Sequence, residues 1–265
     1  MATRFRFRGE IRSCIMGGAM LGAVALSSVS AFAQGEADAS SYARVSAPAM
    51  TPALITVTAA KMGTAADTGR IKAQMEANLS KGFDMLRKGK QETAVKYFDR
   101  VIADADQSLA GDSRPRRCVA DDKPAAPGLV AIDDSLCDAH FGKGYALIDL
   151  GRGDLAEADL RAATEMAPQD AHFANEYAEL FKSRRDWNSA YTLFERAWTV
   201  ADKNPTGKDA SLAARALRGM GYAKSKMGDN VAARALLEQS LTFEPKSEAA
   251  QVQLAQIARL VALGS

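Results

Sequence analysis

Apolar residues recur at helical spacing through most of the chain, beginning near Gly69. In the first such segment they are three or four residues apart, which places them on one face of an α-helix. The positions are Ile71, Met75, Leu79, Phe83 and Leu86, with the small residue Gly82 among them. This periodicity predicts a helical protein in which each helix buries one face.

The later segments repeat small residues in a fixed order. Gly144, Ala146, Gly151, Ala156, Leu160, Ala163 and Pro168 have the same spacing as Gly221, Ala223, Gly228, Ala233, Leu237, Ser240 and Pro245. Two further copies lack the proline and contain Ala178, Leu180, Arg185, Ala190, Phe194 and Ala197, and Gly82, Gly89, Ala94, Phe98 and Val101. Such self-similarity indicates a stack of similar structural units.

The pattern resembles the tetratricopeptide repeat family, in which a small residue, an alanine, a large apolar residue and a proline recur in each repeat. Gly144 and Ala178 start consecutive copies and are 34 residues apart, one repeat length in this family. The resemblance implies pairs of antiparallel helices. A glycine such as Gly151 ends the first helix, a large residue such as Phe98 fills the space between pairs, and a proline such as Pro168 ends the second helix.

The spacing between copies departs from one repeat length at two places. In chain order the first two copies start 62 residues apart, an excess of 28, and the last two start 43 apart, an excess of nine. The smaller excess fits a surface excursion over 203–208. After the last copy, Ser247 is a candidate N-cap for a helix over 248–262, whose Gln251, Gln253 and Gln256 suit a terminal cap. We therefore expect an all-α solenoid of about four helix pairs with a C-terminal capping helix, over 69–263.

The N-terminal residues have the layout of a cleavable secretory signal, 1–33. Four arginines precede an apolar run over 15–26, and the segment closes on Ala31-Phe32-Ala33. An uncleaved membrane anchor is the alternative, but a spanning helix needs about 20 strongly apolar residues, and this run contains glycines and ends in serines. Residues 34–68, rich in Ala, Ser, Thr and Pro, predict a disordered leader. Cleavage would change the 34 basic and 32 acidic residues to 30 and 31, a net charge of −1, which removes the hint of a nucleic-acid partner.

Two cysteines remain after cleavage, and both fall in the larger insertion, at about 107–137. In an oxidising compartment Cys118 and Cys137 favour a disulfide, which would close a loop of about 20 residues and contribute roughly 3 kcal/mol. A redox pair and a metal site are the alternatives, but the spacing is not C-x-x-C and the chain has only two histidines, His140 and His172. A structural disulfide is the preferred interpretation.

Catalytic motifs are absent from the sequence. It contains no G-x-S-x-G, P-loop, H-E-x-x-H or glycine-rich nucleotide turn. The insertion carries four aspartates, Asp121, Asp122, Asp133 and Asp134, without the alternating ligand spacing of a calcium loop. We expect a solvated acidic loop there, no metal, no cofactor and no enzymatic activity.

The resemblance implies a concave groove lined by the first helices, which receives an extended or helical peptide. Residues three before, one after and four after each small residue share one helix face. They are Leu79, Phe83 and Leu86, then Phe141, Tyr145 and Ile148, then Asn175, Glu179 and Lys182, then Arg218, Tyr222 and Ser225, with Arg215 one turn earlier. This predicts a groove that is apolar at one end and basic and aromatic at the other. The alternative is that the leader or the insertion covers the apolar half, which would make its aromatic residues core.

These expectations converge on a non-enzymatic adaptor or scaffold in the periplasm of a Gram-negative-type envelope. A partner with an apolar anchor and an acidic end would suit the predicted groove. A permanent structural subunit of a larger envelope complex, or a homo-oligomer, is the alternative function.

Overall fold

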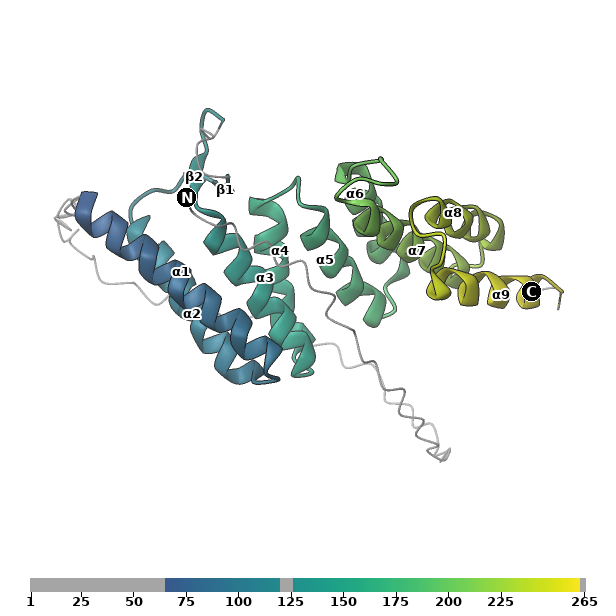
Figure 1. The fold of residues 1–265 in the computed structure, drawn as a ribbon, viewed down its shortest axis with the longest axis horizontal. Helices are drawn as coiled ribbons and strands as arrows, with labels where there is room; N and C mark the ends of the chain where they lie inside the picture. The colour runs from purple at the N-terminus through teal and green to yellow at the C-terminus, as the bar shows by residue number, and fades with distance from the viewer. Residues whose placement is uncertain (1–64, 120–125, 263–265) are drawn as a thin grey trace, which may run out of the picture. The chain divides into compact units, whose positions relative to one another are not determined.

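The computed structural model describes residues 65–119 and 126–262, and these form nine helices and one two-stranded ribbon (Figure 1). The helices are α1 Ala65–Arg87, α2 Gln91–Ser108, α3 Asp134–Asp149, α4 Gly153–Met166, α5 Ala171–Ser183, α6 Trp187–Val200, α7 Ala210–Lys226, α8 Asn230–Phe243 and α9 Glu248–Ala262. The strands are β1 Arg116–Cys118 and β2 Val130–Ile132. The predicted signal peptide and almost all of the predicted leader lie outside the described residues. No helix within these residues is long and apolar enough to cross a membrane.

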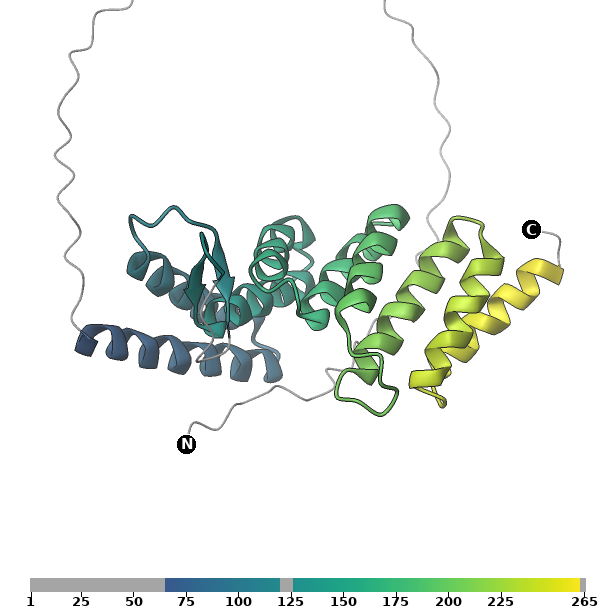
Figure 2. The same cartoon turned by 90° about the horizontal axis from the view of Figure 1, so that it is seen from above.

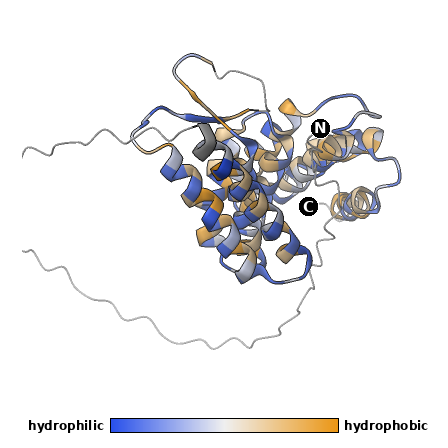
Figure 3. Cartoon of the chain, turned by 60° about the vertical axis from the view of Figure 1, so that its left-hand side comes forward, coloured by the Kyte–Doolittle hydropathy of each residue, from blue (hydrophilic) through white to orange (hydrophobic). Residues whose placement is uncertain are grey.

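The helices pack as consecutive pairs, α1 with α2, α3 with α4, α5 with α6 and α7 with α8, and α9 follows against α8 (Figure 2). First helices of neighbouring pairs also touch, α1 with α3 and α5 with α7. Figure 3 shows polar and apolar positions interspersed along the helices. The predicted solenoid of four helix pairs with a final helix is confirmed.

The turns inside the pairs use the left-handed backbone conformation that glycine adopts at least cost. Gly89, Gly151 and Gly228 end the first helices with φ of 67°, 72° and 87°. In the third pair the non-glycine Arg185 takes the same conformation, with φ of 62°. The second helices α4 and α8 end two residues before Pro168 and Pro245, so both kinds of predicted helix end are confirmed.

Aspartates cap several helices, because a carboxylate can accept the unpaired amide hydrogens of the first turn. Asp133 accepts from the Ser135 amide at the start of α3 (2.9 Å), and Asp170 accepts from the His172 amide at the start of α5 (2.8 Å). Asp133 also pairs with Lys72 of α1 (3.3 Å). The prediction of a solvated acidic loop is therefore wrong for Asp133, while Asp121 and Asp122 lie outside the described residues.

Large side chains fill the space between pairs, as predicted. Phe98, Phe194 and Leu237 are fully buried, and Leu160 is 1% exposed. Phe98 touches two first helices at glycines: a Cβ on Gly82 or on Gly142 would lie 2.5 Å from a carbon of its ring. A ring carbon at that distance leaves room for a hydrogen atom but not for a methyl group.

The insertion between α2 and α3 is held by a disulfide and a short parallel ribbon. Cys118 and Cys137 are bonded, which confirms the predicted pair, and the bond joins the end of β1 to α3. Arg116, Arg117 and Cys118 of β1 lie opposite Val130, Ala131 and Ile132 of β2. Arg117 also donates to the carbonyl of Glu165 in the last turn of α4 (3.0 Å). The strands were not predicted, because three residues are too few to establish a period of two.

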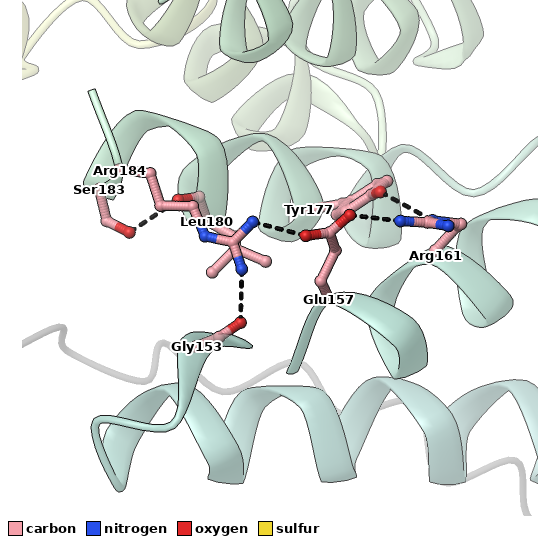
Figure 4. A network of polar contacts seen from close by, with 7 residues as sticks. All are labelled: Gly153, Glu157, Arg161, Tyr177, Leu180, Ser183 and Arg184. Carbon is pink, nitrogen blue, oxygen red and sulfur yellow. Dashed lines mark hydrogen bonds and ion pairs between the residues drawn. The ribbon is translucent and has the colours of Figure 1, made fainter. Parts of the chain in front are cut away.

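A polar network joins the second and third pairs (Figure 4). Glu157 of α4 pairs with Arg161 one turn later and with Arg184 at the end of α5 (2.5 Å to Arg184). Arg184 also donates to the carbonyl of Gly153 (2.8 Å), and Arg161 donates to the hydroxyl of Tyr177 (3.3 Å). Hydrogen bonds from Arg184 and then Arg161 hold the pKa of Glu157 below its ordinary value. Its arginines are partly exposed to solvent, so the network orients the two pairs more than it stabilises them.

Substitution of Gly142 tests the close contact between pairs. Gly142→Ala should lower the free energy of unfolding by about 1–3 kcal/mol, because the added methyl group overpacks against Phe98. Gly69→Ala in α1 is the matched control: no atom lies within 4 Å of its added Cβ, and alanine is the better helix former. Urea denaturation of both variants measures the difference. Equal stabilities would contradict the close contact.

Candidate functional site

The first-helix face is the set of predicted groove positions on α1, α3, α5 and α7. Its members on α1 are Leu79, Phe83 and Leu86, which are half-buried and pack against the largest core cluster. The ring of Phe83 meets the ring of Phe98 edge-on at 5.2 Å. This part of the face contributes to the core of the first two pairs.

The members on α3 are also drawn into the core. Phe141 is 8% exposed, and its ring stacks on Phe173 at 5.0 Å and lies 4.7 Å from the ring of His172, both on α5. Tyr145 and Ile148 are half-buried. Phe141 is therefore a core residue because α5 packs on it, which neither interpretation of the apolar half had predicted, while Tyr145 stays half-buried.

Asn175 of α5 joins two first helices. Its side chain is fully buried and its amide donates to the carbonyl of Leu212 in α7 (3.1 Å). Its Oδ1 has no hydrogen-bond partner among the described residues. Asn175 thus lies inside the stack and is not on the open part of the first-helix face.

Both arginines predicted for the basic end are paired within the chain. Arg215 contacts Glu176 and lies 3.8 Å from Glu179, both on α5, and Arg218 contacts Glu244 after α8. Burial alone would lower the pKa of Arg215, but Glu176 and then Glu179 hold it above its ordinary value. The expectation that these arginines supply free positive charge is therefore corrected: carboxylates compensate their charges, and of these only Glu179 was among the predicted groove positions.

Lysines on and beside the first-helix face supply positive charge instead. We call Lys182, Trp187, Tyr222 and Lys226 the lysine–tyrosine cluster. The Lys182 and Lys226 ammonium groups lie 5.5 Å and 5.3 Å from the centre of the Tyr222 ring, and the Trp187 ring meets it edge-on at 5.8 Å. Lys182 pairs with Glu179, whereas exposed Lys226 has no ion pair within the described part of the chain. The sequence pattern identified Tyr222 and Lys182, but Lys226 and Trp187 lay outside it.

The N-terminal ends of α3 and α5 are acidic, in contrast to the C-terminal ends of α5 and α7. Burial, then Asp134, Asp170 and Asp133, raise the pKa of half-buried Asp138 to about 7. Burial lowers the pKa of His172 on the adjacent helix, which favours the neutral form of its ring. No group of three or more His, Cys, Asp or Glu side chains in residues 65–119 and 126–262 is arranged to hold a metal ion. The charge on this face thus changes along the helix axes, from acidic at the starts of α3 and α5 to basic at the ends of α5 and α7.

The comparisons with known proteins agree with this architecture. The tetratricopeptide repeat family profile matches residues 138–170, which cover most of α3 and all of α4. The chain has the fold of a tetratricopeptide-repeat solenoid. Among solved structures, PilF of Pseudomonas aeruginosa superposes with a TM-score of 0.53 at 14% identity, covering 72% of this chain and 71% of PilF. A tetratricopeptide repeat protein from Parabacteroides merdae gives a TM-score of 0.52 at 14% identity, with 72% and 61% covered. The comparison with curated proteins found no match.

The raised pKa of Asp138 predicts how stability depends on pH. The folded chain holds this proton up to about pH 7, whereas an unfolded aspartate releases it near its ordinary pKa of 3.8. The carboxyl therefore stabilises the fold below about pH 4, and that contribution is lost as the pH rises to about 7. Asp138→Asn should raise the free energy of unfolding at pH 8 by about 1–3 kcal/mol, since one pKa unit corresponds to about 1.4 kcal/mol.

Thermal unfolding of both proteins at pH 5 and pH 8 measures this effect. Asp154→Asn, at an exposed position in the first turn of α4, is the control and should not be more stable than the wild type at pH 8. If Asp138→Asn and the wild type lose stability in parallel between pH 5 and pH 8, ionisation of Asp138 does not cause the loss, and its pKa is not raised in the folded chain.

Proposed function

We propose that this protein is a non-enzymatic adaptor or scaffold of the tetratricopeptide repeat type that binds a peptide or protein segment on its first-helix face. The fold supports protein–protein interaction as the general function, since stacked repeats present extended binding surfaces. The observation that carries the proposal is the lysine–tyrosine cluster, where exposed Lys226 lies against Tyr222 without an ion pair in the described residues. An acidic side chain or terminal carboxylate of the partner would compensate that charge.

Half-buried Tyr145, and His172 whose pKa is lowered by burial, favour a partner segment that combines apolar area with few acidic groups. The tyrosine ring offers apolar area with a polar tip, a combination common in binding surfaces. Because Arg215 and Arg218 are already paired, the partner's carboxylates are expected at the ends of α5 and α7 and not between α5 and α8. The proposed contact is therefore smaller and more localised than a fully basic groove.

We also propose a periplasmic location. The signal-like segment 1–33 supports export, and the Cys118–Cys137 bond is of the kind that persists in oxidising compartments. The alternative function is a permanent structural subunit of an envelope complex or homo-oligomer, in which the first-helix face stays covered. The size of the purified protein discriminates between the two, because a stable monomer favours the adaptor.

Export predicts two properties of the protein isolated from cells. Its N-terminal peptide should begin at Gln34, and Cys118 and Cys137 should resist alkylation until a reductant is added. Cell fractionation with mass spectrometry of the N-terminal and cysteine peptides measures both. A full-length N-terminus with freely alkylated cysteines would rule out the periplasmic assignment while leaving the binding proposal intact.

Crosslinking in cells tests the binding face. A photoreactive amino acid at Lys226 should give a discrete adduct, because this residue lies in the proposed contact. The same substitution at Lys96, exposed on the second helix α2, should not. Once mass spectrometry has identified the partner, Lys226→Glu should weaken its binding about tenfold at low salt and less at high salt. Adducts from Lys96 alone would place the partner on the second helices.

A further inference from the structure

The last helix α9 stands in register with the repeats. Ala255 follows Gly221 by 34 residues, the same step that separates Ala178 from Gly144. Each of these small residues lies in the middle of its first helix. By position, α9 is therefore the first helix of a fifth repeat, and Figure 2 shows it following α8 at the end of the stack.

In complete pairs this small residue is covered by the second helix of its own pair. A Cβ on Gly144 would lie 2.7 Å from Leu160, and a Cβ on Gly221 would lie 2.9 Å from Leu237. Ala178 has no exposed surface. Ala255, by contrast, is exposed, because no helix in the described residues takes the place of the second helix.

The neighbouring turns of α9 show the same difference. The positions that correspond to Gln251 are fully or almost fully buried in the third and fourth pairs, at Ala174 and Leu217. Gln251 itself is exposed, and so is Ala258 one turn beyond Ala255. The opposite side of α9 is docked: Ile257 is 3% exposed and packs with Leu237 of α8. One side of α9 thus completes the stack, and the other has the position of an interface without its second helix.

The chemistry of this open side differs from that of a solvated cap. Its residues are Gln251, Ala255, Ala258 and Ala262, and none carries a charge. Val252 beside them is 56% exposed. Terminal caps of repeat stacks usually have a polar outer face, whereas three alanines leave space for a large apolar side chain, as Gly221 does for Leu237.

A helix from another protein fits this side better than a second copy of α9. Two α9 helices would place alanine on alanine, so neither copy would supply the large side chain that Leu160 and Leu237 supply in the complete pairs. A helix with a leucine or phenylalanine at its centre would repeat the contact of Leu237 with Gly221. The internal interfaces of the chain therefore indicate the shape of the occupant.

We propose that the side of α9 formed by Gln251, Ala255, Ala258 and Ala262 binds an amphipathic helix of a partner protein, which packs there as the second helix of a fifth repeat. This surface is separate from the first-helix face, so it does not depend on the function proposed above. The chain would then bind one partner on its first-helix face and another at its C-terminal end.

The chain's own second helix provides the probe. A fluorescent peptide of residues 229–245, which contains α8 and its capping Asp229, should bind the full-length protein saturably in fluorescence anisotropy. Ala255→Glu should weaken binding at least tenfold, because it places a charge at the centre of the interface. Ala249→Glu, also exposed but on another side of α9, is the matched control and should bind as the wild type does. Absent binding, or equal loss in both variants, would overturn the proposal.

A covalent extension tests the same surface without relying on the weak helicity of a short peptide. In this variant residues 1–260 are followed by a second copy of 227–245, which keeps the spacing of the α7–α8 turn and puts its glycine, Gly228, in the place of Ala262. The melting temperature should rise by several degrees, and Ala255→Glu should remove the gain. An extension that is cleaved by protease and leaves the melting temperature unchanged would contradict the proposal. Sedimentation of the unextended protein decides the occupant: a dimer that Ala255→Glu dissociates would assign the surface to a second copy and overturn the partner helix.

Discussion

The contact between a large side chain and a glycine on the neighbouring helix is the constraint on which the stack depends. Phe98 lies against Gly82 of its own pair and Gly142 of the next, and the ring of Phe194 lies against Gly219. Because a β-carbon would not fit at any of these glycines, the helix axes approach more closely than ordinary side chains allow. This close approach sets the position of each first helix relative to the next and buries the large side chains between pairs.

Close packing of first helices has consequences for the face that they form. Phe141 reaches Phe173 and becomes core, and Arg215 reaches Glu176 on the preceding first helix. A half-buried arginine needs a carboxylate to offset its lost hydration, so the pair stabilises the packing mainly by avoiding an unpaired charge. Around α5 and α7, positive charge remains available for a partner at the ends of these helices, where Lys226 is exposed. The packing that positions the face therefore also removes much of its expected charge.

The repeat pattern made most of the fold predictable from the sequence. Turn glycines, the large residues between pairs and the Cys118–Cys137 bond follow from local spacing and from the parity of cysteines. The arginine pairs were not predictable in this way, because Arg215 and Arg218 find their carboxylates 39 and 26 residues away in the sequence. Periodicity shows which residues share a face, but not which side chains cross from one helix to the next. The left-handed turn at Arg185 had no glycine to mark it, and only its alignment with Gly151 and Gly228 indicated its place.

The two ends of the stack differ in how the repeat is terminated. At the start, α1 is covered by α2 and α3, and the disulfide ties the insertion to α3. At the other end, α9 has the residue spacing of a first helix, and it buries Ile257 against α8 but leaves Ala255 exposed. In a stack stabilised by contacts between neighbours, a terminal helix that lacks one neighbour loses one of its interfaces and is held less firmly. A helix docked on α9 would order α9, and this effect would pass to α8 through the contact of Ile257 with Leu237. Leu237 also packs against Gly221 of α7. Binding at the C-terminal end would therefore be linked to the packing of α7, which carries Tyr222 and Lys226.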